Sequence, residues 1–287
     1  MTTGNSAAAA AGSLKVGTFE INRMAFGAMR ITGRGIWGEP RDRDGAKVVL
    51  RRAVELGVNF IDTANSYGPE VSERLIAEAL HPYEGVVVAT KGGLLRDGPG
   101  RWRADCSPEQ LRAACEGSLR RLKVDTIDLY QLHTVDRKVP YEDSIGALKS
   151  LQEDGKINHI GVSNVKETQL RLAQSIVEVV SVQNRYNLSD RAAESVVDTC
   201  SAQEIPFLPW HPLAVGDLTE RGGVLDDVAG KHDATPGQVA LAWLLHRSPV
   251  MVPIPGTSSV DHLEENVAAV RLQLSDDDVE DIAAAAG

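Results

Sequence analysis

Residues 57–62 read GVNFID, a helix-ending glycine followed by a short apolar strand that runs into a carboxylate. Two later stretches end in the same way. VVVATK at residues 86–91 ends in a lysine, and IDLYQLH at residues 127–133 ends in a histidine. Because the carboxyl ends of parallel strands meet at one mouth of a barrel, we expect these polar side chains to converge there.

The alternation of apolar strands with amphipathic helices continues along the whole chain and predicts an α/β fold of the (β/α)8 TIM-barrel type. We expect strands near 24–27, 58–61, 86–90, 127–132, 158–162, 180–183, 206–210 and 250–254. Helices are expected at 42–56, 70–80, 108–122, 141–154, 167–178, 190–203, 235–247 and from about 259, with a last short helix from Ser275.

The first twelve residues differ in composition from the rest of the chain. Residues 1–12 are small and polar, which predicts a disordered tail, and residues 13–287 are expected to form a single domain. Residues 14–21, with Gly17 in the middle, predict a short N-terminal β-hairpin.

The composition excludes several classes of function. The 287 residues carry a net charge of -10 with no basic run, which argues against nucleic acid as a partner. No apolar run is long enough to span a membrane and no signal peptide is evident, so we expect a cytoplasmic protein, either a monomer or a weak oligomer. The three cysteines form no CxxC motif, and neither HExxH nor HxH occurs, so no metal site is expected.

Two segments have sequence features of phosphate-binding sites, and only the second is expected to bind a cofactor. Residues 33–38 match GxGxxG, but a proline follows two residues later and no helix opens there, so a Rossmann site is not expected. Residues 254–259, IPGTSS, instead lead from the eighth strand into a helix. Free amides at a helix start, with hydroxyls beside them, bind phosphate without a net positive charge.

Asp62, Tyr67, Lys91 and His133 form the candidate catalytic set, with Tyr67 in the turn after Asp62. Each residue alone also fits a structural role, but the four in this order at strand ends indicate a site. Lys91 would favour the charged form of the Tyr67 phenol and so sharpen its acidity, while Asp62 would keep Lys91 charged. His133 would orient a carbonyl oxygen.

The assembled motifs resemble the aldo-keto reductase family over nearly the whole chain from Val16 onward. The resemblance rests on DTA at 62–64 with YG at 67–68, KG at 91–92, LH at 132–133, GVSN at 161–164, Gln183, IPG at 254–256 and EN at 265–266. Other stretches are similar to bacterial members that include pyridoxal reductases. The family resemblance implies that Asp62, Tyr67, Lys91 and His133 are a catalytic tetrad for reducing aldehydes or ketones to alcohols.

The same resemblance implies a nicotinamide cofactor. Ser163, Asn164 and Gln183 would hold its carboxamide and Trp210 would stack on its ring. The remaining implied contacts are Pro212, Leu213, Gly216, Leu218, Ile254, Gly256, Thr257, Ser258, His262, Glu265 and Asn266. Gly256 and His262 stand where members often carry Lys and Arg for the 2'-phosphate. NADPH is therefore the expected cofactor, with NADH possible.

A small-molecule carbonyl substrate would bind against loops at the mouth, with Met29, Trp37, Leu94 and Trp102 as candidate walls. Such an apolar, aromatic rim suits aldehydes, aryl ketones or a pyridine carbaldehyde such as pyridoxal. Two alternatives remain open at this point. One is a Schiff-base barrel aldolase with Lys91 as nucleophile, and the other is a cofactor-binding sensor or partner subunit.

Overall fold

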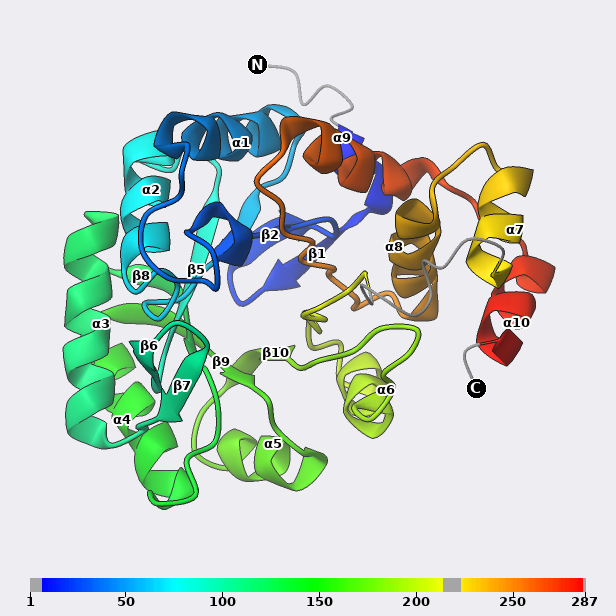
Figure 1. The fold of residues 1–287 in the computed structure, drawn as a ribbon. Coiled ribbons are helices and arrows are strands. Elements are labelled where there is room, and N and C mark those ends of the chain that lie inside the picture. Colours follow the sequence, from blue (N-terminus) through cyan, green and yellow to red (C-terminus); the bar gives the residue numbers. More distant parts are fainter. Residues whose placement is uncertain (1–6, 214–222, 286–287) are drawn as a thin grey trace.

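The computed structural model describes residues 7–213 and 223–285. Its centre is a curled sheet of six parallel strands in the order β10-β9-β8-β5-β4-β3 (Figure 1). The strands are β3 (Phe26–Gly27), β4 (Phe60–Asp62), β5 (Val87–Gly92), β8 (Ile127–Leu132), β9 (Ile157–Ser163) and β10 (Val179–Gln183). The sheet matches the predicted α/β class, and neighbouring strands run parallel because each connection between them crosses over through other elements.

Helices surround this sheet, as Figure 1 shows. They are α1 (Arg43–Glu55), α2 (Val71–Leu80), α3 (Pro108–Leu122), α4 (Tyr141–Glu153), α5 (Glu167–Gln174), α6 (Glu194–Ala202), α8 (Pro236–Arg247) and α9 (Val260–Ala268). Thr235 caps α8 through a capping box, as its sequence indicates. Gly57 and Gly155 follow α1 and α4 with φ of 90° and 73°, a left-handed conformation that suits glycine.

The predicted seventh and eighth strands are not regular strands. Isolated parallel bridges join Phe207 to Val182 on one side and to Met251 on the other. On the far side, the amides of Ala25 and Gly27 donate to the carbonyls of Pro253 and Pro255, at 3.0 and 3.2 Å. Prolines recur in both segments, and because proline has no N–H, each removes a donor from the ladder.

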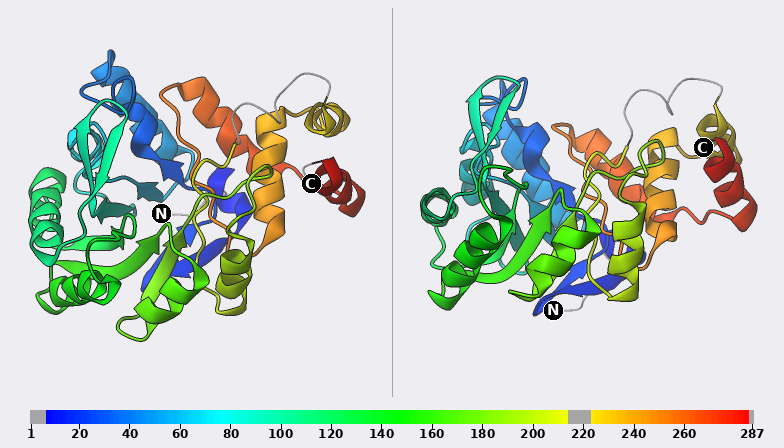
Figure 2. Two further views of the ribbon diagram at one scale, coloured as in Figure 1. Left: turned by 60° about the horizontal axis from the view of Figure 1, so that its bottom comes forward. Right: turned by 90° about the horizontal axis from the view of Figure 1, so that it is seen from below.

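The N-terminal hairpin is confirmed as β1 (Ser13–Val16) paired with β2 (Phe19–Asn22). Its buried Val16 and Ile21 pack with Phe60 and Leu129 from the inner face of the sheet. A second hairpin, β6 (Leu94–Gly98) with β7 (Arg101–Ala104), lies in the connection after β5 and was not predicted. Figure 2 shows the two hairpins at opposite ends of the molecule. The β6–β7 hairpin therefore belongs to the end where the strands finish.

Several boundaries differ from the predicted ones. Residues 7–11 of the predicted disordered tail form the short 3-10 helix η1 (Ala7–Ala11), because Ala8 is fully buried and its amide donates to Leu56 O at 3.0 Å. Ser107 precedes α3 but does not cap it, since its hydroxyl donates to Asp105 instead. Helices α7 (Val224–Lys231) and α10 (Asp276–Ala285) complete the chain, and α7 was not predicted.

Candidate active site

A buried ion pair lies at the carboxyl ends of β4 and β5. The Lys91 ammonium donates to Asp62 Oδ2 at 2.7 Å and to the Thr63 carbonyl at 2.8 Å. The Lys91 and Asp62 side chains are 0% and 3% exposed. Asp62 is the last residue of β4 and Lys91 the last but one of β5, and the pleat points both side chains into the interior of the curled sheet. A charge removed from water this completely needs its partner, and the pair therefore fixes both groups.

The second oxygen of Asp62 is held from the other side of the interior. Gln131 Nε2 donates to Asp62 Oδ1 at 3.1 Å and Gln183 Nε2 donates at 2.8 Å. Both glutamines are buried. Gln131 was missed in the sequence, although its place two residues before His133 on an inward-facing register was the available signal. Side chains from four strands thus meet at the single carboxylate of Asp62.

Tyr67 and His133 stand next to this pair. The two rings make an edge contact, with centroids 5.9 Å apart and planes at 83°, and Lys91 Nζ lies 5.2 Å from the Tyr67 ring centre. The turn that carries Tyr67 is closed by its amide, which donates to Ala64 O at 3.1 Å. The structure therefore brings the four predicted catalytic side chains together.

Burial decides the protonation state of these groups. It raises the pKa of Tyr67, and the nearby Lys91 opposes this without reversing it. Burial alone would lower the pKa of Lys91, but Asp62 and Tyr67 raise it overall. Burial and the Lys91 charge hold the pKa of His133 well below its ordinary value. Lys91 is thus charged, Tyr67 protonated and His133 neutral near pH 7, and the expected sharpening of Tyr67 acidity is outweighed by desolvation.

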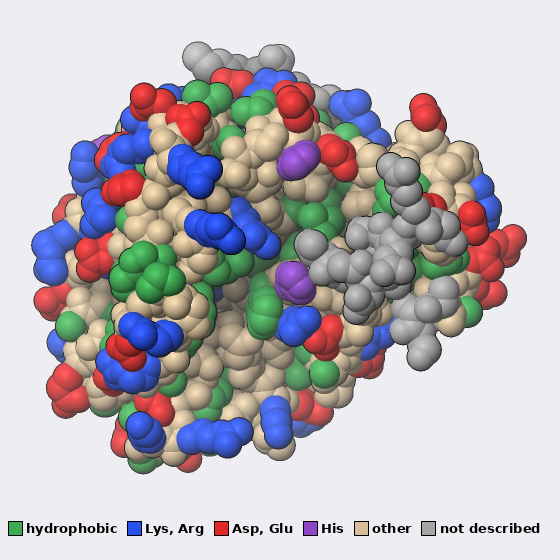
Figure 3. All heavy atoms as spheres, viewed as in Figure 1, with side chains coloured by type: hydrophobic (Ala, Val, Ile, Leu, Met, Phe, Trp, Pro, Cys, Tyr) green, Lys and Arg blue, Asp and Glu red, His purple; other side chains and the backbone are tan. Residues whose placement is uncertain are grey.

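A cavity of about 390 Å³ opens over Tyr67 and His133. Three of the predicted substrate walls, Met29, Leu94 and Trp102, line it, together with Ile36. Trp37 is not among the described residues that line it. Its ring instead lies 5.6 Å from the Arg96 guanidinium, which sits 3.8 Å from the Trp102 ring. Figure 3 shows this face of the molecule, with hydrophobic side chains around a central hollow.

Most of the predicted cofactor contacts also meet at this cavity. The lining residues among them are Ser163, Asn164, Gln183, Trp210, Pro212, Leu213, Ile254 and Gly256. The Trp210 indole N–H donates to Asn164 Oδ1 at 3.0 Å, and Asn164 Nδ2 donates to the His133 carbonyl at 2.9 Å. A flat ring beside amide and hydroxyl groups fits a nicotinamide with its carboxamide.

The other predicted contacts lie outside this cavity. Thr257 and Ser258 precede α9, whereas His262, Glu265 and Asn266 lie on the helix. The Glu265 carboxylate accepts from Thr235 Oγ1 at 2.6 Å. Gly216 and Leu218 lie outside the described residues. Sequence reasoning missed Arg30 and His211, which line the cavity. Arg30 follows the predicted wall Met29 directly, and this proximity was its only signal.

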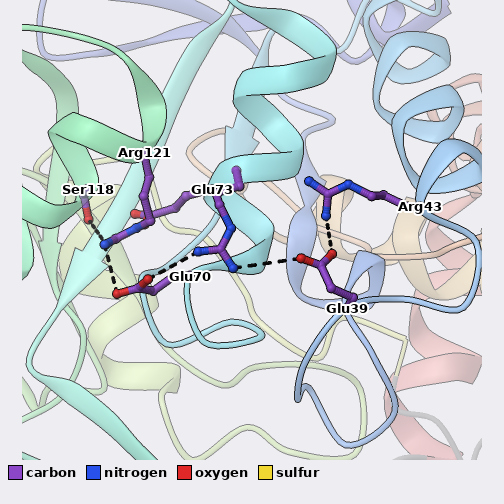
Figure 4. A network of polar contacts seen from close by, with 7 residues as sticks. Glu39, Arg43, Glu70, Glu73, Ser118 and Arg121 are labelled. Carbon is purple, nitrogen blue, oxygen red and sulfur yellow. Dashed lines mark hydrogen bonds and ion pairs between the residues drawn. The ribbon is translucent and has the colours of Figure 1, made fainter.

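A network of charges on the outer side of the sheet supports the strand that carries Lys91. Thr90, which faces away from the interior, donates to the fully buried Glu73 at 2.6 Å, and Glu73 accepts from Arg121 at 2.6 Å. Figure 4 shows how Arg121 also reaches Glu70, and how further ion pairs extend to Glu39. This network links α1, α2 and α3, and through Thr90 it fixes the outer side of β5.

The site defines a class of protein, because a buried phenol and a buried ammonium lie beside a cavity at the carboxyl ends of parallel strands. Residues 23–286 match the model of the Aldo/keto reductase family. The chain belongs to the Aldo/keto reductase family and is an NAD(P)-dependent oxidoreductase. No helix in the described part of the chain is long and apolar enough to cross a membrane.

Two relatives are similar over most of their length. An uncharacterized oxidoreductase of Schizosaccharomyces pombe is 51% identical over 268 residues, covering 93% of this chain and 88% of that one. Pyridoxine 4-dehydrogenase of Escherichia coli is 44% identical over 269 residues, covering 91% and 94%. Both names describe oxidoreductases, as the site does.

Two solved structures have a similar fold. The glycerol dehydrogenase of Gluconobacter oxydans has a TM-score of 0.84 at 27% identity and covers 95% of each chain. An aldo/keto reductase of Klebsiella pneumoniae, solved in complex with NADP and acetate, has a TM-score of 0.78 at 25% identity and covers 92% of this chain and 90% of its own. A nicotinamide cofactor is therefore supported for this fold.

Proposed function

We propose that this protein reduces an aromatic aldehyde such as pyridoxal to its alcohol, with NADPH as the preferred hydride donor and Tyr67 as the general acid. The observation that carries the proposal is the Tyr67 phenol, buried beside the Asp62–Lys91 pair and opening onto the cavity. The nicotinamide, when bound, supplies the hydride. The 44% identity to a pyridoxine 4-dehydrogenase supports a pyridine substrate.

The protein's residues act on the carbonyl oxygen. Tyr67 keeps its proton because burial raises its pKa, and it transfers that proton to the oxygen as negative charge develops there. The Lys91 ammonium then stabilises the phenolate that remains. His133, neutral because its pKa is lowered, can only donate or accept a hydrogen bond and so orients the oxygen.

The cavity walls fit a flat, uncharged substrate. Met29, Ile36 and Leu94 are apolar, and Trp102 is 39% exposed, which leaves part of its ring available for stacking. The Arg96 guanidinium lies 3.8 Å from the centre of the Trp102 ring and donates to the Ile36 carbonyl at 2.6 Å. Arg96 therefore ties the β6–β7 hairpin to the loop before α1, and this forms one side of the substrate pocket.

We also infer that the segments 206–210 and 250–255 occupy the seventh and eighth strand positions of a closed (β/α)8 barrel. The bridges at Phe207 and the bonds from Ala25 and Gly27 to Pro253 and Pro255 support this closure. A Schiff-base aldolase is not favoured, because Lys91 has a raised pKa and its ammonium already donates to Asp62 and Thr63. A nucleophilic amine must be neutral.

The test is a panel of carbonyl substrates that includes pyridoxal, benzaldehyde and an aliphatic aldehyde, each with NADPH and with NADH. We expect oxidation of NADPH that depends on the aldehyde, and a higher kcat/KM for aromatic than for aliphatic members. Trp102→Ala should reduce that aromatic preference, while Trp102→Phe keeps it. Negligible turnover with every carbonyl, despite tight cofactor binding, would instead indicate a sensor.

A further inference from the structure

A second cavity adjoins the catalytic one on the side of α9. It has a volume of about 500 Å³, and its lining includes Arg30, Arg34, Arg41, Asp42 and Ser258. Arg30 also lines the catalytic cavity, so the two hollows share a wall. Figure 3 shows Lys and Arg side chains gathered beside the central hollow. We name this second hollow the arginine cavity.

The three arginines carry charge that the described residues do not neutralise. Arg30, Arg34 and Arg41 are exposed, and none has a hydrogen bond or ion pair with another residue in 7–213 or 223–285. Asp42 is the one described carboxylate in the lining, and its Oδ1 accepts the Gly45 amide at 2.8 Å as the cap of α1. Cations therefore outnumber anions there by three groups to one, in a chain whose net charge is -10.

Nearby arginines are paired, which makes this excess local. Arg43 forms ion pairs with Glu39 and Glu78, and Arg74 forms ion pairs with Glu39 and Glu70. Glu39 thus faces away from the cavity arginines toward other partners. An anionic ligand could contact arginines 30, 34 and 41 without breaking an ion pair among the described residues.

Backbone atoms crowd position 256, where family members often carry a phosphate-binding lysine. A Cβ on Gly256 would lie 2.4 Å from the Gly27 carbonyl oxygen and 3.5 Å from Arg30 Cγ. A contact of 2.4 Å with a backbone atom cannot be relieved by a side-chain movement, so a side chain at position 256 would require the backbone here to shift. The Arg30 side chain passes this point, and it lines both cavities.

The opening of α9 adds hydrogen-bond donors on the opposite wall. Ser258 is exposed and lines the arginine cavity, while Ser259 caps the helix by accepting the His262 amide at 3.4 Å. His262 itself is exposed and is not among the residues lining either cavity. Arginine is the side chain best suited to a phosphate, because its planar donors match two phosphate oxygens at once.

We propose that the arginine cavity binds the 2'-phosphate of NADPH, and that Arg34 and Arg41 give the enzyme its preference for NADPH over NADH. This inference rests on the proposed function and refines its cofactor. The ligand chemistry is a phosphomonoester dianion attached to adenosine. The shared Arg30 places this group next to the catalytic cavity, where the nicotinamide end of the same molecule binds.

The experiment compares Arg34→Gln, Arg41→Gln and the double variant with a matched control, Arg51→Gln. Arg51 is exposed and lies on α1, and it lines neither cavity. Dissociation constants are measured for NADPH, NADH and adenosine 2',5'-bisphosphate. We expect the double variant to raise the NADPH constant by about tenfold and that for the bisphosphate similarly, and to change the NADH constant by less than about twofold.

Salt gives a second readout. Because these arginines are exposed, the NADPH preference of the wild type should shrink as KCl is raised, and the double variant should lose most of this salt dependence. Arg51→Gln should keep the wild-type ratio and the wild-type salt response, although it removes the same charge.

Three results would overturn the inference. The first is an NADPH to NADH ratio that is unchanged in the double variant. The second is a larger change in His262→Gln than in the double variant, which would move the phosphate to α9 alone. The third is inorganic phosphate competing as well as the bisphosphate, which would indicate a general anion site. In each case aldehyde reduction would persist, whereas failure of the proposed function would abolish reduction with both cofactors.

Discussion

The catalytic end and the arginine cavity both depend on charge, but they hold it in opposite ways. Lys91 and Asp62 are buried and in direct contact, and every oxygen of Asp62 has a donor. Arg34 and Arg41 are exposed and have no partner among the described residues. A buried charge needs a partner within the folded protein, whereas an exposed charge is stabilised by water until a ligand binds. Substitutions at the catalytic end should therefore reduce activity and stability far more than substitutions in the arginine cavity.

The largest effect is expected for Tyr67→Phe, which removes the transferable proton and keeps the buried ring. Turnover should fall by about 10²–10⁴-fold, since that is the typical contribution of a general acid. Cofactor binding should persist, because the ring contact with His133 remains. Steady-state kinetics with an aromatic aldehyde and a separate NADPH titration measure the two quantities. Near wild-type turnover would remove Tyr67 from its assigned role.

Asp62→Asn should have the next largest effect, and it bears directly on the buried side of the comparison. Without the carboxylate, burial would dominate and the pKa of Lys91 would fall. Because one charge of a buried pair is left uncompensated, we expect the free energy of unfolding to drop by about 3 kcal/mol. Turnover should fall by about tenfold or more, though less than in Lys91→Met, because the Thr63 carbonyl still holds the amine.

Urea unfolding and steady-state kinetics on the same samples measure this prediction. Asp44→Asn is the matched control, since Asp44 is exposed and pairs with Lys47 on the surface of α1. It should leave the free energy of unfolding nearly unchanged, because an exposed ion pair contributes little. If Asp62→Asn proves as mild as the control, the carboxylate is a structural cap with no role in charging Lys91.

Trp210→Ala should have a smaller effect, because Trp210 lines the catalytic cavity and is only partly buried. Loss of the stacking surface should weaken NADPH binding by about 1 kcal/mol, or roughly fivefold. Trp210→Phe separates stacking from the indole bond to Asn164, since it keeps a ring and loses the N–H donor. Equal affinity in all three proteins would place the nicotinamide away from Trp210.

The same contrast explains which parts could be predicted from the sequence. The catalytic residues end apolar strands, and this local pattern locates Asp62, Lys91 and His133 without knowledge of the fold. Gln131 is also on such a strand, but nothing local distinguishes a glutamine that donates to Asp62 from any other buried polar residue. The arginine cavity forms where the segment from Arg30 to Ala46 meets Ser258, and the proximity of segments so distant in sequence leaves no periodic signal.

The fold shows the same limit. Periodicity predicts β4, β5, β8, β9 and β10, whose apolar runs are regular. It overstates the segments 206–210 and 250–254, where prolines leave only isolated bridges. It misses the β6–β7 hairpin because β6 is mostly half-buried, β7 is mostly exposed, and neither has an alternating apolar face. Elements that bury one regular face are therefore predictable, whereas those held by single contacts are not.

The smallest effect is expected for pH across the neutral range, where the buried groups should not titrate at all. Burial raises the pKa of Tyr67 above its ordinary value of 10, and burial with Lys91 lowers that of His133 well below 6.5. The kcat/KM for reduction should therefore vary by less than about twofold between about pH 6.5 and about pH 9. Initial rates at saturating NADPH measure it. An inflection inside this window would mean that a group other than these two controls the proton.

The lowered pKa of His133 should also make the free energy of unfolding depend on pH in the acid range. His133 binds its proton less readily in the folded than in the unfolded chain, so below about pH 6.5 the unfolded state holds more protons and the free energy of unfolding falls. His133→Gln removes this contribution, and its stability should decline less steeply than that of the wild type between pH 6.5 and pH 5, values set by the ordinary histidine pKa of about 6.5. Urea midpoints at both pH values measure the difference. Parallel declines in the two proteins would show that His133 is solvated rather than buried beside a cation. The contrast between buried charges at the catalytic end and exposed charges at the arginine cavity would then be wrong.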